Sequence, residues 1–120
     1  MAVRAIRGAT QVDADDRDEV LAATRELVST VIERNDLDGE QLISILFTAT
    51  PDLKSEFPAL AARELGLGDV PLMCATEIDV PHALPRVLRL MAHVETDRPR
   101  SEIAHVYLRG ATALRRDIAQ

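Results

Sequence analysis

The chain has 120 residues, of which 47% are hydrophobic and 28% are charged, and its formal net charge is −6. These values are typical of one globular domain with a modest core, so we expect a single domain over residues 1–120. The negative charge argues against a nucleic-acid partner, and without a signal peptide or an apolar run of roughly 18 residues we expect no membrane association.

The N-terminal third predicts a strand followed by a long helix. Residues Val3–Thr10 alternate as a strand in which Arg7 projects from a mostly apolar face, and the simplest interpretation is an edge arginine that reaches water. Residues Asp13–Asn35 carry apolar side chains at helical spacing. The acidic run at the start of this segment suits the positive end of a helix dipole. We interpret it as a solvated helix start whose N-cap is one of the early aspartates.

The middle of the chain predicts a second strand and a short helix. Residues Leu42–Thr50 are apolar on both alternating faces, which is typical of a central strand, and Pro51 ends it. Residues Phe57–Gly66 indicate a short helix, because Pro58 stands just inside its start and Gly66 just past its end.

The segment Val70–Val80 holds the only cysteine and is the stretch of greatest functional interest. Its apolar run predicts a buried strand of about four or five residues, which opens into a loop at Glu77 and Asp79. Cys74 by itself is most simply a small core residue. A lone cysteine forms no internal disulfide, which favours a reducing, cytoplasmic compartment, and the paired spacing of a zinc site is lacking.

The C-terminal third begins with an ambiguous pattern. Residues Val87–Thr96 fit both a strand and a helix, and their pattern alone does not decide between the two. After a loop over Asp97–Ser101, residues Ile103–Leu108 predict a short strand with His105 and Tyr107 on one face. The tail from Leu114 onward has weak signals of order.

Six motifs occur in order along the chain, and together they resemble one known family. They are Ile6-Arg7-Gly8-Ala9-Thr10, Ala49-Thr50-Pro51-Asp52-Leu53, Phe57-Pro58-Ala59 with Arg63-Glu64-Leu65, Val70-Pro71 with Cys74 and Glu77, Arg89, and His105-Val106-Tyr107-Leu108. The set is similar to the small, monofunctional chorismate mutases of the trimeric type, from Val3 to about Arg116.

This resemblance implies an α+β fold and a homotrimer. Each subunit would have a mixed sheet of about five strands packed against one long helix and a short helix. Three subunits would form a pseudo-α/β-barrel with active sites at their interfaces. The ambiguous residues 87–96 would then be a strand.

The resemblance also implies the reaction, the Claisen rearrangement of chorismate to prephenate in phenylalanine and tyrosine biosynthesis, with no cofactor and no metal. This isomerisation needs neither a nucleophile nor a proton transfer, and the sequence contains no catalytic triad. The protein must hold a dianion in a compact conformer. It must also stabilise negative charge on the ether oxygen as the C–O bond breaks, for which a fixed cation is the most effective group.

By similarity, each site residue has an expected role. Arg89 faces the ether oxygen, whereas Glu77 and Cys74 meet the ring hydroxyl. The remaining expected substrate contacts are Arg7 and Tyr107 as carboxylate ligands, Phe57 and Arg63 from the adjacent subunit, Ala59 and Met73, and Leu114 and Arg115, which close over the site.

The sequence departs from the family pattern at Leu60, where lysine is frequent, and at Met73, where a small residue is usual. We expect loss of a cation at the rim to affect affinity more than chemistry. The segment between Arg63 and Cys74 is about one residue shorter than in the family. We assign no function to the histidines.

The alternative hypothesis is a trimer that binds small anionic metabolites without catalysis, or a related imine-hydrolysing trimer.

Overall fold

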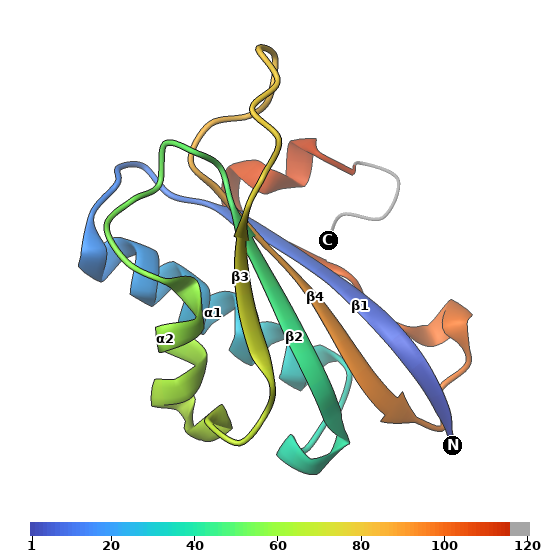
Figure 1. Cartoon of the computed structure of the whole chain (residues 1–120). Helices are drawn as coiled ribbons and strands as arrows, with labels where there is room; N and C mark the ends of the chain where they lie inside the picture. Colours follow the sequence, from blue (N-terminus) through green and yellow to red (C-terminus); the bar gives the residue numbers. More distant parts are fainter. Residues whose placement is uncertain (116–120) are drawn as a thin grey trace.

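The computed structural model describes residues 1–115, which form a five-stranded mixed sheet and two helices (Figure 1). The strands lie in the order β3-β2-β4-β1-β5. The elements are β1 (Ala2–Gln11), α1 (Arg17–Arg34), β2 (Leu42–Ala49), α2 (Pro58–Ala62), β3 (Leu72–Thr76), β4 (Val87–Thr96) and β5 (Val106–Tyr107). Within these residues, no helix is long and apolar enough to cross a membrane.

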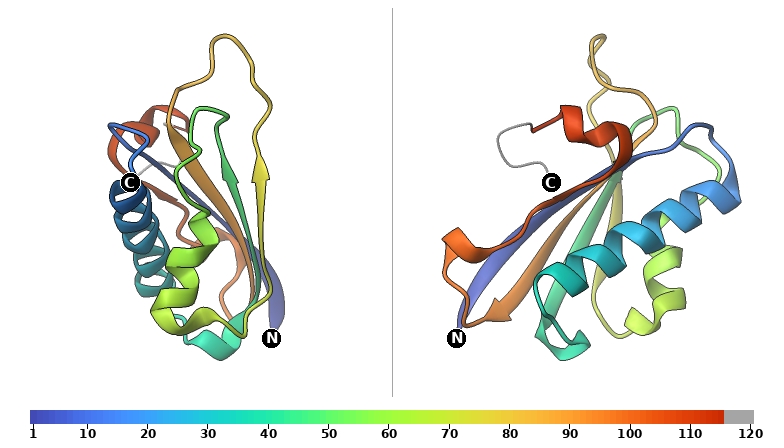
Figure 2. Two further views of the ribbon diagram at one scale, coloured as in Figure 1. Left: turned by 60° about the vertical axis from the view of Figure 1, so that its left-hand side comes forward. Right: turned by 180° about the vertical axis from the view of Figure 1, so that it is seen from behind.

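Both helices cover the same face of the sheet (Figure 2). The core forms between them and the sheet, where Ile6, Phe47 and Val94 are at most 1% exposed and meet Leu27 and Val28 of α1. The apolar stripe predicted for the long helix is therefore confirmed, and its burial supplies the main favourable term in folding.

Neither α1 nor α2 covers the opposite face of the sheet, and we call it the open face. Its residues follow from the pairing of β1, β2 and β3 with their neighbours: Val3, Ala5, Arg7, Ser44, Leu46, Thr48, Met73, Ala75, Arg89, Met91 and His93. Val3 and Met73 are 60% and 66% exposed, so large apolar side chains remain uncovered on this face.

The long helix begins four residues later than predicted. The carboxylate of Asp16 accepts a hydrogen bond from the Glu19 N–H at 3.0 Å, which makes Asp16 the N-cap of α1. The helix ends at Arg34, and the buried amide of Asn35 then exchanges two hydrogen bonds with the backbone of Ala104, at 2.8 and 2.9 Å. Asn35 thus holds the chain just before β5 against the end of α1.

The short helix also follows its predicted signals. Pro58 is the first residue of α2, and the chain continues beyond Ala62 as a wider turn over Arg63–Leu67. Gly66 has a φ of 90° within that turn, a conformation that glycine adopts without steric cost.

The third strand has the predicted five residues, but the prediction that it is buried is wrong. β3 is an edge strand that pairs only with β2 among the described residues, so its side chains are covered on one face alone. Leu72 and Cys74 turn toward the helices and are half-buried, whereas Met73 points to the open face. The run is apolar on both sides, yet only its helix side has a covering layer in one chain.

β4 resolves the ambiguity that the pattern left open. All ten of its residues pair antiparallel with β1, and its other edge pairs with β2. The resemblance to the family therefore led to the correct strand. The two ladders, of which the one with β2 shifts register between Leu42 and Ser44, satisfy backbone groups that an isolated helix of this sequence would satisfy locally.

The last predicted strand is shorter than expected. The interval 103–108 contributes only Val106–Tyr107 to the sheet, because Asn35 takes up the backbone groups of Ala104. A short helical turn, Arg109–Ala113, then crosses the end of β1. Leu114 packs against a small cluster of Ala9, Tyr107 and Ala111, and the predicted tail beyond Arg115 lies outside the described residues.

Candidate active site

An ion pair on the open face joins the ends of β3 and β4. The carboxylate of Glu77 lies 3.1 Å from Nε of Arg89 and accepts a hydrogen bond from the Thr48 hydroxyl at 2.7 Å. Thr48 is the partner of Arg89 in the sheet register, so β2 delivers the hydroxyl to the same point. Glu77 itself is held by its N–H, which donates to the carbonyl of Ala49 at 2.9 Å. Three strands thus hold the guanidinium in one place.

The Arg89 guanidinium retains an unused donor. Although the carboxylate of Glu77 is close, the Nε–H does not point at it well enough to form a hydrogen bond. This buried nitrogen therefore has no hydrogen-bond acceptor among the described residues. The carboxylate still pairs with the guanidinium electrostatically, and 43% of the Arg89 side chain is exposed, so the cation is open to an anionic ligand on this face.

Arg7 lies on the same face, one step farther along the sheet. Its register partner is Met91, whereas Arg89 pairs with Ala9, so the two cations occupy neighbouring rows. Arg7 is exposed and lines a cavity of about 580 Å³ together with Arg4, Arg100, His93 and His105. The titratable residues that line this cavity are all basic, which suits an anionic ligand.

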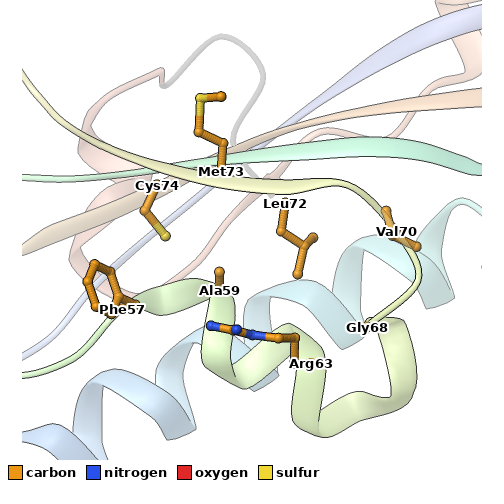
Figure 3. A pocket seen from close by; sticks show the side chains of 8 residues that line it. All are labelled: Phe57, Ala59, Arg63, Gly68, Val70, Leu72, Met73 and Cys74. Atoms are coloured by element: carbon orange, nitrogen blue, oxygen red, sulfur yellow. The ribbon is translucent and has the colours of Figure 1, made fainter.

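A separate cleft of about 440 Å³ lies between α2 and the edge strand β3 (Figure 3). Figure 3 shows Cys74 on the α2 side of β3, near Phe57 and Ala59, while Met73 points the opposite way. Phe57 is 66% exposed at the mouth of this cleft. The residues that line it are Phe57, Ala59, Arg63, Gly68, Val70, Leu72, Met73 and Cys74.

Tyr107 lies on the edge strand opposite β3, and Leu114 packs beside it. Tyr107 pairs with Ala9, which is itself opposite Arg89, but the turn Arg109–Ala113 leaves Tyr107 only 3% exposed. Leu114 is half-buried against the same cluster, and Arg115 follows it.

One chain therefore gathers the predicted residues in two separate places. The open face holds the cations Arg7 and Arg89 with Glu77, and the cleft holds Arg63 with Cys74. The sheet separates them, since side chains alternate along β3 and positions 74 and 77 point to opposite faces. The grouping of Cys74 with Glu77 on one ligand is thus not met within a single chain.

Comparison with known proteins identifies the family of this chain. The family model for chorismate mutase type I matches residues 3–118. The chain belongs to this family. Chorismate mutase AroH of Thermus thermophilus is 47% identical to it over 117 residues, covering 97% of this chain and 96% of that protein. Chorismate mutase AroH of Bacillus subtilis is 43% identical over 120 residues, covering 99% and 94%.

The fold agrees with the sequence match. A solved chorismate mutase from Clostridium thermocellum superposes with a TM-score of 0.91 at 47% identity, covering 92% of this chain and 98% of that one. These matches decide against the alternative of an imine-hydrolysing or non-catalytic trimer. The type I chorismate mutases are isomerases of aromatic amino acid biosynthesis.

Sequence reasoning missed two contacts in this chorismate mutase. The first is the hydrogen bond from the Thr48 hydroxyl to Glu77, which depends on the register between strands. The alternation of side chains along the strand could have suggested that Thr48 shares a face with Glu77. The second is His105, whose Nδ1 accepts the backbone N–H of Arg7 at 2.9 Å. Burial first, then the charges of Arg7 and Arg115, lower the pKa of His105, which favours the neutral ring that this bond requires.

Proposed function

We propose that this chorismate mutase converts chorismate to prephenate in active sites that two subunits of a homotrimer share. The open face of one subunit would supply the catalytic cation, and the cleft of its neighbour would supply the opposite wall. The observation that carries this proposal is the Arg89–Glu77 ion pair, held at 3.1 Å on a sheet face that the described residues of one chain leave uncovered.

The chemistry needs only positioning and charge. The rearrangement breaks a C–O bond as a C–C bond forms within one molecule, so no proton leaves and no covalent intermediate is needed. Arg89, held by Glu77, would face the ether oxygen, where negative charge grows in the transition state. Glu77 would also meet the ring hydroxyl. A preorganised guanidinium pays little reorganisation energy during the reaction.

The other residues would hold the substrate in its reactive conformer. Arg7 and Tyr107 would bind carboxylates of the dianion, and a planar guanidinium suits a carboxylate better than a point charge does. Leu114 and Arg115 would close over the bound substrate from the segment that already packs on Tyr107. From the neighbouring cleft, the proposed contacts are Phe57, Ala59, Arg63 and Cys74. Met73 is also a proposed contact, and its side chain points to the open face.

The case for a second copy comes from what one chain leaves exposed. Val3, Leu46 and Met73 are 60%, 38% and 66% exposed on the open face, although a sheet face of this kind is normally covered when it is apolar. β3 beside the cleft is an unprotected edge strand. A trimer would cover both features. It would also bring Arg63 of one subunit close to Arg7 and Arg89 on the open face of its neighbour.

We expect light scattering at micromolar concentration to give a mass of about 40 kDa, three times the 13.2 kDa of one chain. Leu46→Glu places a charge on the open face and should yield inactive monomers. Val80→Glu is the matched control, because Val80 is equally exposed, at 39%, but lies in the loop after β3. A wild-type monomer that consumes chorismate at full rate would overturn the shared site.

Cys74 should be dispensable as a nucleophile. Because the rearrangement forms no covalent intermediate with the protein, we expect Cys74→Ser to retain most activity, with a loss of at most about tenfold, or ~1.4 kcal/mol. The measurement is kcat and KM from the loss of chorismate absorbance on folded protein. Complete inactivation of a folded, trimeric Cys74→Ser variant would contradict the proposed reaction type.

We continue to expect a reducing, cytoplasmic compartment, since the single cysteine has no internal partner.

A further inference from the structure

The loop between β2 and α2 carries Phe57 into the cleft, yet its own conformation is irregular over residues 50–57. Phe57 is the N-cap residue of α2, and no side chain among the described residues caps this helix. One apolar anchor, Leu53, attaches the loop to the cluster around Val20. An exposed aromatic at the end of such a loop needs further contacts to hold one position, because ordering it during binding would cost affinity.

Asp15 supplies the first of these contacts. Both of its carboxylate oxygens lie 3.1 Å from the N–H of Lys54, and Oδ1 also accepts from the N–H of Ser55 at 3.0 Å. The pKa of Asp15 is lowered first by the nearby Ser55 hydroxyl and then by these two N–H groups. The hydroxyl lies close to the carboxylate but falls short of hydrogen-bond geometry. The acidic run is therefore more than a solvated helix start, because Asp16 caps α1 while Asp15 binds the loop.

The second contact is an ion pair that reaches the site residue itself. Nε of Arg17, in the first turn of α1, donates to Oε1 of Glu56 at 3.0 Å. Oε2 of the same carboxylate accepts the backbone N–H of Phe57 at 2.9 Å. This bond to Phe57, and then Arg17, lower the pKa of Glu56, so its charged form is favoured. Arg17, Glu56 and Phe57 thus form one continuous chain of contacts.

We propose that Asp15 and the Arg17–Glu56 pair are positioning residues that hold Phe57 as a wall of the substrate cleft. The proposal rests on the proposed contact between Phe57 and chorismate. It gives the start of α1 a role in the active site, although none of these three residues touches the reacting atoms. Such supporting contacts keep a binding wall in its productive geometry before the ligand arrives.

The kinetic test uses the sign of the charge change. The substrate is a dianion. If charge alone matters, removing an anionic side chain should leave KM unchanged or lower it, and removing a cationic side chain should raise KM. Positioning instead predicts that Glu56→Gln and Arg17→Gln both raise KM, by about three- to tenfold, with kcat within about twofold. The double variant should match the single variants, since both remove the same pair.

Asp15→Ala should raise KM by a similar factor. Asp13→Ala is its matched control, because Asp13 is an exposed aspartate of the same acidic run whose side chain binds no loop N–H among the described residues. We expect this control to leave KM within about twofold of wild type. A KM that falls in Glu56→Gln while it rises in Arg17→Gln would overturn the proposal in favour of simple charge effects.

A reporter separates this inference from the proposed substrate contact. The chain has no tryptophan, so Phe57→Trp introduces a single fluorophore whose nanosecond anisotropy reports local motion. Asp15→Ala and Glu56→Gln should lower that anisotropy and Asp13→Ala should not. Unchanged anisotropy in all three backgrounds would overturn the positioning role. Lower anisotropy with unchanged KM would uphold positioning and contradict the contact between Phe57 and the substrate.

Discussion

Arg89→Ala should lower kcat by about 10²–10³-fold or more, while KM rises far less. The guanidinium faces charge that grows only as the C–O bond stretches, so its charge stabilises the transition state more than the bound substrate. The ion pair with Glu77, at 3.1 Å, already fixes the guanidinium on the open face, so little reorganisation is needed as that charge develops.

Two further substitutions separate charge from shape. Arg89→Lys keeps the charge but loses the planar fork, so it should recover part of the rate. A neutral isostere of the same shape should behave like the alanine variant. Arg34→Ala, an exposed position at the end of α1, is the control for loss of any one cation and should change kcat less than about twofold.

The measurement is kcat and KM for all four variants on folded trimers. If the neutral isostere keeps a kcat close to that of wild type, electrostatic stabilisation by Arg89 is wrong. The site would then work chiefly by holding the reactive conformer, and the cations would serve binding alone.

Mixing two damaged variants should restore activity. Arg89→Ala spoils the open face and Arg63→Ala spoils the cleft, so each homotrimer has only damaged sites. In a randomly assembled equal mixture, about a quarter of the sites would combine an intact open face with an intact neighbouring cleft. Co-refolded mixtures, assayed below KM, should therefore reach about a quarter of wild-type activity.

The control pairs Arg89→Ala with Arg7→Ala. Both residues lie on the open face of the same chain, so no arrangement of these subunits rebuilds an intact open face. This mixture should stay at the level of its parents. Equal recovery in both mixtures, or recovery in neither, would contradict an active site divided between the open face and the cleft.

Several features of the molecule could be read from the sequence because they depend on local preference. The 3.6-residue apolar stripe of α1 and the Pro58–Gly66 punctuation of α2 both led to the observed elements. The alternation in β1 placed Arg7 on its correct face. The family motifs indicated the reaction and the strand at residues 87–96, where periodicity fitted helix and strand equally.

Other features depend on which segments meet, and no local pattern carries that information. β3 reads as a buried strand, yet its place at the edge of the sheet leaves one side uncovered in a single chain. The contact of Thr48 with Glu77 requires β2, β3 and β4 in one register. A shift by one residue would turn these side chains to opposite faces.

The acidic run before α1 illustrates the same division. Its composition determined a helix start, because short polar side chains satisfy the first N–H groups of a helix wherever the chain goes next. Only the tertiary structure decided that Asp15 binds the N–H groups of a loop almost 40 residues away. Local hydrogen bonds are specified by neighbours in the sequence, whereas partners for a loop are chosen by how the sheet and the helices pack.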